Sequence, residues 1–163
     1  MLAVSLQEQG IRTSGADGTD LLSQSVTAYR AALQVYTQAD HPVNWAMMQN
    51  NLGNTLKNQG TRTSGADGAD LLAQAVTAYR AALQVRTQVD HPVDWAMTQE
   101  NIAVAHCEIS EHDSCDTPKP ELQKALAAID AALTVFDPVH MSYNFQKATK
   151  FRKRILAKLD ALP

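Results

Sequence analysis

Apolar residues along this chain recur at intervals of one, three and four positions, with polar residues between them. Between Asp70 and Gln88, the apolar side chains are Leu71, Leu72, Ala75, Val76, Tyr79, Ala82 and Leu83. These intervals form one stripe on a 3.6-residue helix, whereas a half-buried strand would alternate every second residue. Such stripes predict helices over residues 1–9, 19–38, 42–59, 69–88, 92–110, 120–136 and 141–160. The predicted fold class is therefore all-α.

The chain contains a tandem repeat with a period of 50 residues. Residues 10–50 and 60–100 give 41 aligned positions, of which 32 are identical. The same shift continues more faintly at both ends, because Leu133 falls on Leu83 and Leu6 falls on Leu56. This predicts one repeat domain, with the tail of a preceding repeat (1–10), two full repeats (11–60 and 61–110) and a degenerate capping repeat (111–163). We expect the chain to be the carboxyl-terminal part of a longer repeat protein.

Each repeat is predicted to hold two antiparallel helices whose apolar faces are buried by stacking on neighbouring pairs, as in a solenoid. Gly60 is expected to stop its helix in the left-handed conformation, and Pro92 suits a first turn that Asp90 could cap. The last helix should present a polar outer face. Its basic residues are Lys147, Lys150, Arg152, Lys153, Arg154 and Lys158.

Small and bulky residues follow one another along the repeat in a pattern that resembles the tetratricopeptide repeat (TPR) family. The positions that carry the resemblance are Asn51-Leu52-Gly53, Leu56, Gly60, Ala75, Tyr79 and Ala82. The common repeat has about 34 residues, so this chain resembles the longer TPR-like variants of large bacterial and signalling proteins. HEAT-type repeats are nearer in length but do not explain these motifs. The resemblance implies a short right-handed α-solenoid of about seven helices.

TPR stacks bind peptides or partner helices on a concave face lined by the first helix of each pair. By that resemblance, the expected partner-binding residues are Met47, Asn50, Asn51, Asn54, Lys57, Asn58, Met97, Glu100, Asn101, Val104 and Glu108. Asn51 and Asn54 resemble the asparagines that hold a bound peptide backbone, since an amide both donates and accepts hydrogen bonds. The lysines that clamp a terminal carboxylate in some family members have no counterpart beyond Lys57.

Composition and charge narrow the classes of partner. The 163 residues are 45% apolar and 19% charged, with a formal net charge of −3, so neither nucleic acid nor membrane is an expected partner. No apolar run approaches the ~20 residues needed to span a bilayer. The amino-terminal residues also lack the features of a secretory signal. Two cysteines are too few for a disulfide framework, and a cytoplasmic location is expected.

The glycine-rich string Arg-Thr-Ser-Gly-Ala-Asp-Gly occurs twice, at 12–18 and 62–68. It lacks the lysine of a P-loop and the several carboxylates of a calcium loop. We interpret it as a turn between paired helices, in which Asp67 or Asp70 (Asp17 or Asp20 in the first copy) accepts N–H groups of the next helix. The repetition favours an architectural role.

Zinc-type ligands gather at one place only, and their spacing fits no common closed site. They are His106, Cys107, His112 and Cys115. His106 replaces Leu56 on the packing stripe, which favours a core histidine, so we expect no metal and no cofactor.

No nucleophile elbow or metalloprotease motif occurs, and enzymatic activity is not expected. The favoured hypothesis is a non-enzymatic protein-interaction scaffold that binds a peptide or partner helix in its groove. The alternative is a structural spacer or a self-associating module without a separate ligand.

Overall fold

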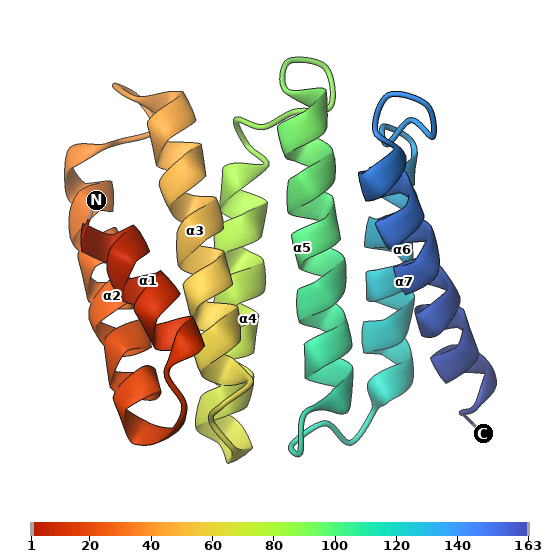
Figure 1. Cartoon of the computed structure of the whole chain (residues 1–163), viewed down its shortest axis with the longest axis horizontal. Coiled ribbons are helices and arrows are strands. Elements are labelled where there is room, and N and C mark those ends of the chain that lie inside the picture. The colour runs from red at the N-terminus through yellow and green to blue at the C-terminus, as the bar shows by residue number, and fades with distance from the viewer. Residues whose placement is uncertain (1, 163) are drawn as a thin grey trace. The chain divides into compact units, whose positions relative to one another are not determined.

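The computed structural model describes residues 2–162, which contain seven α-helices and no strand (Figure 1). The helices are α1 (Leu2–Arg12), α2 (Gly15–Val35), α3 (Pro42–Gly60), α4 (Gly65–Ala82), α5 (Pro92–Glu111), α6 (Pro118–Leu133) and α7 (Ser142–Asp160). The predicted all-α fold class is confirmed. No helix in this range is both long and apolar enough to cross a bilayer. The chain divides into two compact units, the first ending at Val85 and the second beginning at Arg86.

In the first unit, α1 pairs with α2 and α3 pairs with α4, and α3 also contacts α2 and α1. The two helices of the α3–α4 pair approach each other most closely at small residues. A methyl group on Gly60 would lie 2.9 Å from Leu72 Cγ and 3.0 Å from the carbonyl oxygen of Gly68. Gly60 is the last residue of α3 and Thr61, which follows it, has φ −65°. The predicted left-handed stop at Gly60 is therefore wrong, and this glycine instead permits close approach of two helices.

The ring of Tyr79 fills a notch at Gly53. A methyl group on Gly53 would lie only 2.6 Å from Cε1 of the Tyr79 ring. Tyr79 is completely buried, and its hydroxyl donates a hydrogen bond of 2.8 Å to Oδ1 of Asn54. Burial also raises the pKa of the Tyr79 hydroxyl, which therefore stays protonated as a donor. Gly53, Asn54 and Tyr79 thus depend on one another, because the glycine makes room for the ring and the amide accepts from its hydroxyl.

The second unit differs at all three of these positions. In place of Gly53, Asn54 and Tyr79 it has Ala103, Val104 and Ile129, respectively. Isoleucine is smaller than tyrosine and has no hydroxyl. The glycine notch and the amide acceptor are therefore both dispensable in that unit.

The first repeat combines the same positions in a third way. It has Ala3 and Tyr29, and the hydroxyl of Tyr29 donates to Oε1 of Gln7 at 3.1 Å. Gln7 lies one turn further along its helix than the position equivalent to Asn54, so the phenol reaches a different partner.

We predict that Gly53→Ala lowers the free energy of unfolding by about 1–2 kcal/mol, because the added methyl overlaps the Tyr79 ring. The triple change Gly53→Ala, Asn54→Val and Tyr79→Ile copies the second unit and should recover part of this loss. Urea unfolding followed by circular dichroism measures both. A Gly53→Ala variant as stable as the wild type would contradict the notch.

The first residue of the glycine-rich string ties one repeat to the preceding one. Nη1 of Arg62 donates to the carbonyl oxygens of Gly10 (2.7 Å) and Thr13 (3.0 Å), and Nη2 donates to that of Ile11 (2.8 Å). Carbonyl groups at a helix end lack partners within the helix. Arg62 therefore caps the carboxyl end of α1 from the next repeat.

The remainder of the string starts a helix earlier than predicted. Helices α2 and α4 begin at Gly15 and Gly65, whose φ angles of 73° and 68° suit glycine. Ser64 occupies the cap position of α4 without a side-chain hydrogen bond. Asp67 lies in the first turn, where a negative charge suits the helix dipole.

The predicted aspartate caps are wrong. Oδ2 of Asp70 accepts a hydrogen bond from Gln74 (2.7 Å), and the equivalent Asp20 accepts one from Gln24 (2.8 Å). Asp90 does not cap α5, because its carboxylate accepts from the hydroxyl of Thr87 at 2.6 Å. These carboxylates bond to nearby side chains.

Helix α4 ends six residues before the predicted end at 88. Its last turn tightens, because the N–H groups of Gln84 and Val85 donate to the carbonyl groups three residues earlier, at 3.0 and 3.2 Å. Such a turn satisfies terminal carbonyl groups but ends the α-helical ladder.

Arg62→Ala should lower the free energy of unfolding by about 1–2 kcal/mol, because three helix-end carbonyl groups lose their donor. Arg12→Ala is the matched control, since Arg12 is the equivalent exposed residue of the first repeat and its side chain makes no hydrogen bond or ion pair among residues 2–162. It should change stability by less than about 0.5 kcal/mol. Equal effects in thermal unfolding would show that the three hydrogen bonds do not stabilise the unit.

Candidate functional site

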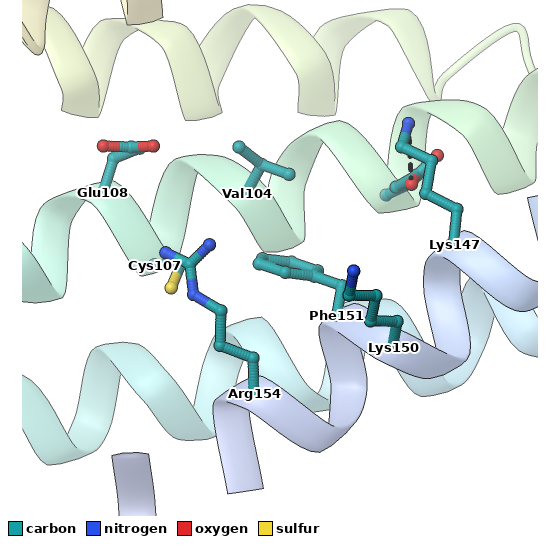
Figure 2. A pocket seen from close by; sticks show the side chains of 8 residues that line it. Val104, Cys107, Glu108, Lys147, Lys150, Phe151 and Arg154 are labelled. Carbon is teal, nitrogen blue, oxygen red and sulfur yellow. Dashed lines mark ion pairs between the residues drawn. The ribbon is translucent and has the colours of Figure 1, made fainter. Parts of the chain in front are cut away.

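A pocket of about 340 Å³ opens in the second unit between α5 and α7 (Figure 2). Within this unit, α5 pairs with α6, and α7 packs against α6. The lining residues recur at helical intervals of three and four, so one face of α5 and one face of α7 converge on the same space. They are Glu100, Val104, Cys107 and Glu108 from α5, and Lys147, Lys150, Phe151 and Arg154 from α7.

Apolar side chains occupy the middle of the pocket. Val104 faces the ring of Phe151 across the space between the two helices, with Cys107 beside them (Figure 2). Val104 and Phe151 are half-buried and Cys107 is buried. An apolar side chain entering from outside would therefore find an apolar surface already present.

An ion pair stands at each end of this apolar region. Nζ of Lys147 lies 3.1 Å from Oε1 of Glu100, a carboxylate whose side chain is only 8% exposed (Figure 2). At the other end, Nη2 of Arg154 lies 3.2 Å from Oε1 of Glu111, and Lys158 pairs with the same carboxylate. Since residue numbers rise together in the two pairs, α5 and α7 run in parallel.

The Glu111 carboxylate is held in its charged form. Burial raises the pKa of Glu111, but hydrogen bonds from Lys158, Cys107 and Arg154 outweigh burial, so its pKa lies below the ordinary value. Arg152 makes a further ion pair with Asp130 of α6 at 2.5 Å. Four basic residues of α7 thus pair with acids of α5 and α6, whereas the sequence predicted only a polar outer face.

Two charged lining residues, Glu108 on α5 and Lys150 on α7, remain available. Neither has an ion-pair partner among residues 2–162. A ligand can therefore reach one anion and one cation on opposite walls of the pocket.

The predicted partner-binding residues fall into two sets. On α3, Met47, Asn51, Asn54, Lys57 and Asn58 are half-buried and Asn50 is buried. On α5, Glu100, Val104 and Glu108 are brought together at the pocket, whereas Met97 and Asn101 are not among its lining residues.

Both asparagines expected to hold a peptide backbone make hydrogen bonds inside the first unit. Asn54 accepts from the hydroxyl of Tyr79, and the side chain of Asn51 bonds to the hydroxyl of Tyr29. Burial, the larger influence, raises the pKa of Tyr29 to about 12, and the Asn51 bond lowers it.

Sequence reasoning missed the α7 side of the pocket. The sequence predicted Lys147, Lys150 and Arg154 only as part of a polar cap and assigned no role to Phe151, although all four line the pocket. The repeat contained a usable signal, because a shift of 50 places these four on the predicted groove residues Met97, Glu100, Asn101 and Val104.

Both histidines among the candidate zinc ligands have other partners. Nδ1 of His106 lies 2.7 Å from Oε2 of Glu121, and only 4% of His106 is exposed, as expected for a core histidine. Nδ1 of His112 bonds to the hydroxyl of Ser114. Within residues 2–162, no three His, Cys, Asp or Glu side chains are grouped as metal ligands.

Comparison with protein-family models, with curated proteins and with solved structures finds no match to this chain.

We predict that Cys107 reacts slowly with iodoacetamide at pH 8. Burial raises the pKa of Cys107 to about 11, and the hydrogen bond of 3.3 Å from its Sγ to Glu111 adds to the shift. Only about one thousandth of the thiol is then ionised at pH 8, and the thiolate is the reactive form. Its rate should rise roughly tenfold per pH unit up to pH 10.

A Cys115→Ser variant isolates Cys107 in this measurement, and a Cys107→Ser variant isolates Cys115, which lies half-exposed in a loop. Intact-protein mass spectrometry gives both rates. A Cys107 rate that levels off below pH 9 would contradict the buried, protonated thiol.

Proposed function

We propose that this chain is a non-enzymatic scaffold for protein–protein interaction, and that the α5–α7 pocket anchors an apolar side chain of the partner. The observation that carries the proposal is the half-buried pair of Val104 and Phe151 between rows of charged residues. Interfaces concentrate binding energy where a large side chain enters an apolar pocket with a polar rim.

The sequence resemblance to TPR proteins supports this proposal. In that family the first helices of successive pairs line the binding face. Helix α5 is the first helix of the α5–α6 pair, and a shift of 50 residues places α7 at the position equivalent to α5. Three residues selected by that resemblance, Glu100, Val104 and Glu108, line the pocket.

The chemistry of the lining groups also favours binding over catalysis. Glu100 is neutralised by Lys147, and the Cys107 thiol, with its pKa raised to about 11, is a poor nucleophile at neutral pH. The pocket offers contact area and charge to a partner.

We predict that Val104→Glu weakens peptide binding at least tenfold, which corresponds to about 1.4 kcal/mol. Peptides are first selected from a random displayed library against the full chain, and their Kd values are then measured by fluorescence polarisation. Val89→Glu is the control, because this variant introduces the same charge at a residue that is 89% exposed in the loop before α5. Its effect should be less than twofold.

Two outcomes would contradict the proposal. One is a peptide that binds wild type and Val104→Glu equally, which excludes the pocket. The other is failure to select peptides together with self-association that Val104→Glu abolishes in sedimentation velocity. The second result would favour the self-associating module.

A further inference from the structure

We infer that the occupant of this pocket is an amphipathic helix of a partner protein, carrying an apolar residue between one basic and one acidic side chain. This inference rests on the proposed function and adds the conformation and charge of the ligand.

The equivalent faces of α3 and α5 differ in the side chains that they present. On α3, positions 50, 54 and 58 are all asparagine, whereas the equivalent positions of α5 are Glu100, Val104 and Glu108. Amides match the alternating donors and acceptors of an extended backbone. Valine offers neither a donor nor an acceptor, and the Glu100 carboxylate is already paired with Lys147. This face of α5 therefore has fewer groups than three amides to bond an extended backbone, and buried backbone groups without partners cost free energy.

A helix avoids this cost because its backbone groups bond to one another. It meets the pocket through side chains alone. The residues that replaced the asparagines suit side-chain recognition, with Val104 for an apolar group and Glu108 for a cation.

The charges that line the pocket favour a ligand with charges of both signs. The ion pairs Lys147–Glu100 and Arg154–Glu111 use the charges at both ends of the pocket. Glu108 on α5 and Lys150 on α7 have no ion-pair partner among residues 2–162. Glu108 therefore attracts a cation of the ligand, and Lys150 attracts an anion. A ligand with two charges of the same sign satisfies one of them and is repelled by the other.

The length of the pocket matches a short helical segment. The lining residues of α5 span Glu100 to Glu108, which is about 12 Å at 1.5 Å per residue, or a little over two turns of helix. Lys147 lies opposite Glu100, so Lys150, one turn further, is offset from Glu108 by roughly 7 Å along the pocket. A basic and an acidic residue one to two turns apart on the partner helix match this offset.

The test uses four hydrocarbon-stapled, alanine-rich helical peptides with a central leucine. The leucine lies three residues after one flanking position and four residues before the other. The flanking pairs are Lys and Glu, Gln and Gln, Glu and Glu, and Lys and Lys. Kd values are measured by fluorescence polarisation against the full chain at low salt, where charge effects are least screened.

The Lys and Glu peptide should bind about threefold to fivefold more tightly than the Gln and Gln peptide. Both like-charged peptides should bind more weakly than the Lys and Glu peptide. Lys150→Glu should make the Lys and Lys peptide the tightest. Lys153→Glu is the matched control on α7, because Lys153 is exposed and does not line the pocket. It should leave the order of the four peptides unchanged.

Equal binding of the Lys and Glu peptide and the Gln and Gln peptide, lost in Val104→Glu, would overturn the charge inference and leave the proposed function standing. A proline-containing linear peptide of the same side chains that binds as tightly would overturn the helical occupant. Absence of binding by all four peptides would overturn this inference and count against the proposed function as well.

Discussion

The close approach of two helices at small residues is the constraint on which the packing of the first unit depends. At Gly60 the backbone of one helix meets a leucine and a carbonyl group of the next, and at Gly53 it meets the ring of Tyr79. Neither place has room for an additional methyl group. Close packing of this kind determines which face of α3 is buried against α4.

Several residues that differ between the repeats contact one another in the structure, so the differences as well as the identities report which side chains are neighbours. Arg86, Asp94 and Thr98 are three of the nine positions that differ between the two closely matched repeats. The structure joins them, because the Arg86 guanidinium donates to the hydroxyl of Thr98 at 3.2 Å and lies 4.0 Å from the carboxylate of Asp94. Burial lowers the pKa of Arg86, and the Asp94 charge acts against that effect.

The pocket follows the same rule. Glu100 replaces an asparagine of the preceding repeat, and Lys147 replaces a methionine. The two replacements form one ion pair across α5 and α7. On α5, two asparagine positions of the preceding repeat, 50 and 58, thus hold the carboxylates Glu100 and Glu108 on either side of Val104.

The sequence by itself determined that the chain is helical, that it repeats every 50 residues, and which stripe of each helix is buried. Leu72, Ala75 and Tyr79, selected by periodicity, are completely buried, because a 3.6-residue period specifies one face of a helix without reference to its neighbours. The early helix starts at Gly15 and Gly65 were missed because a glycine with positive φ can begin a helix where the hydrophobic pattern is silent.

Only the tertiary structure decided which distant side chains meet. Arg62 reaches the end of α1, and Lys147 and Phe151 of α7 share a pocket with residues of α5 that lie 39 to 51 positions earlier. Periodicity cannot supply these contacts, because the distance and direction between two helices depend on how the helix between them packs. The sequence identified candidate groove residues on one helix, and folding provided the opposite wall.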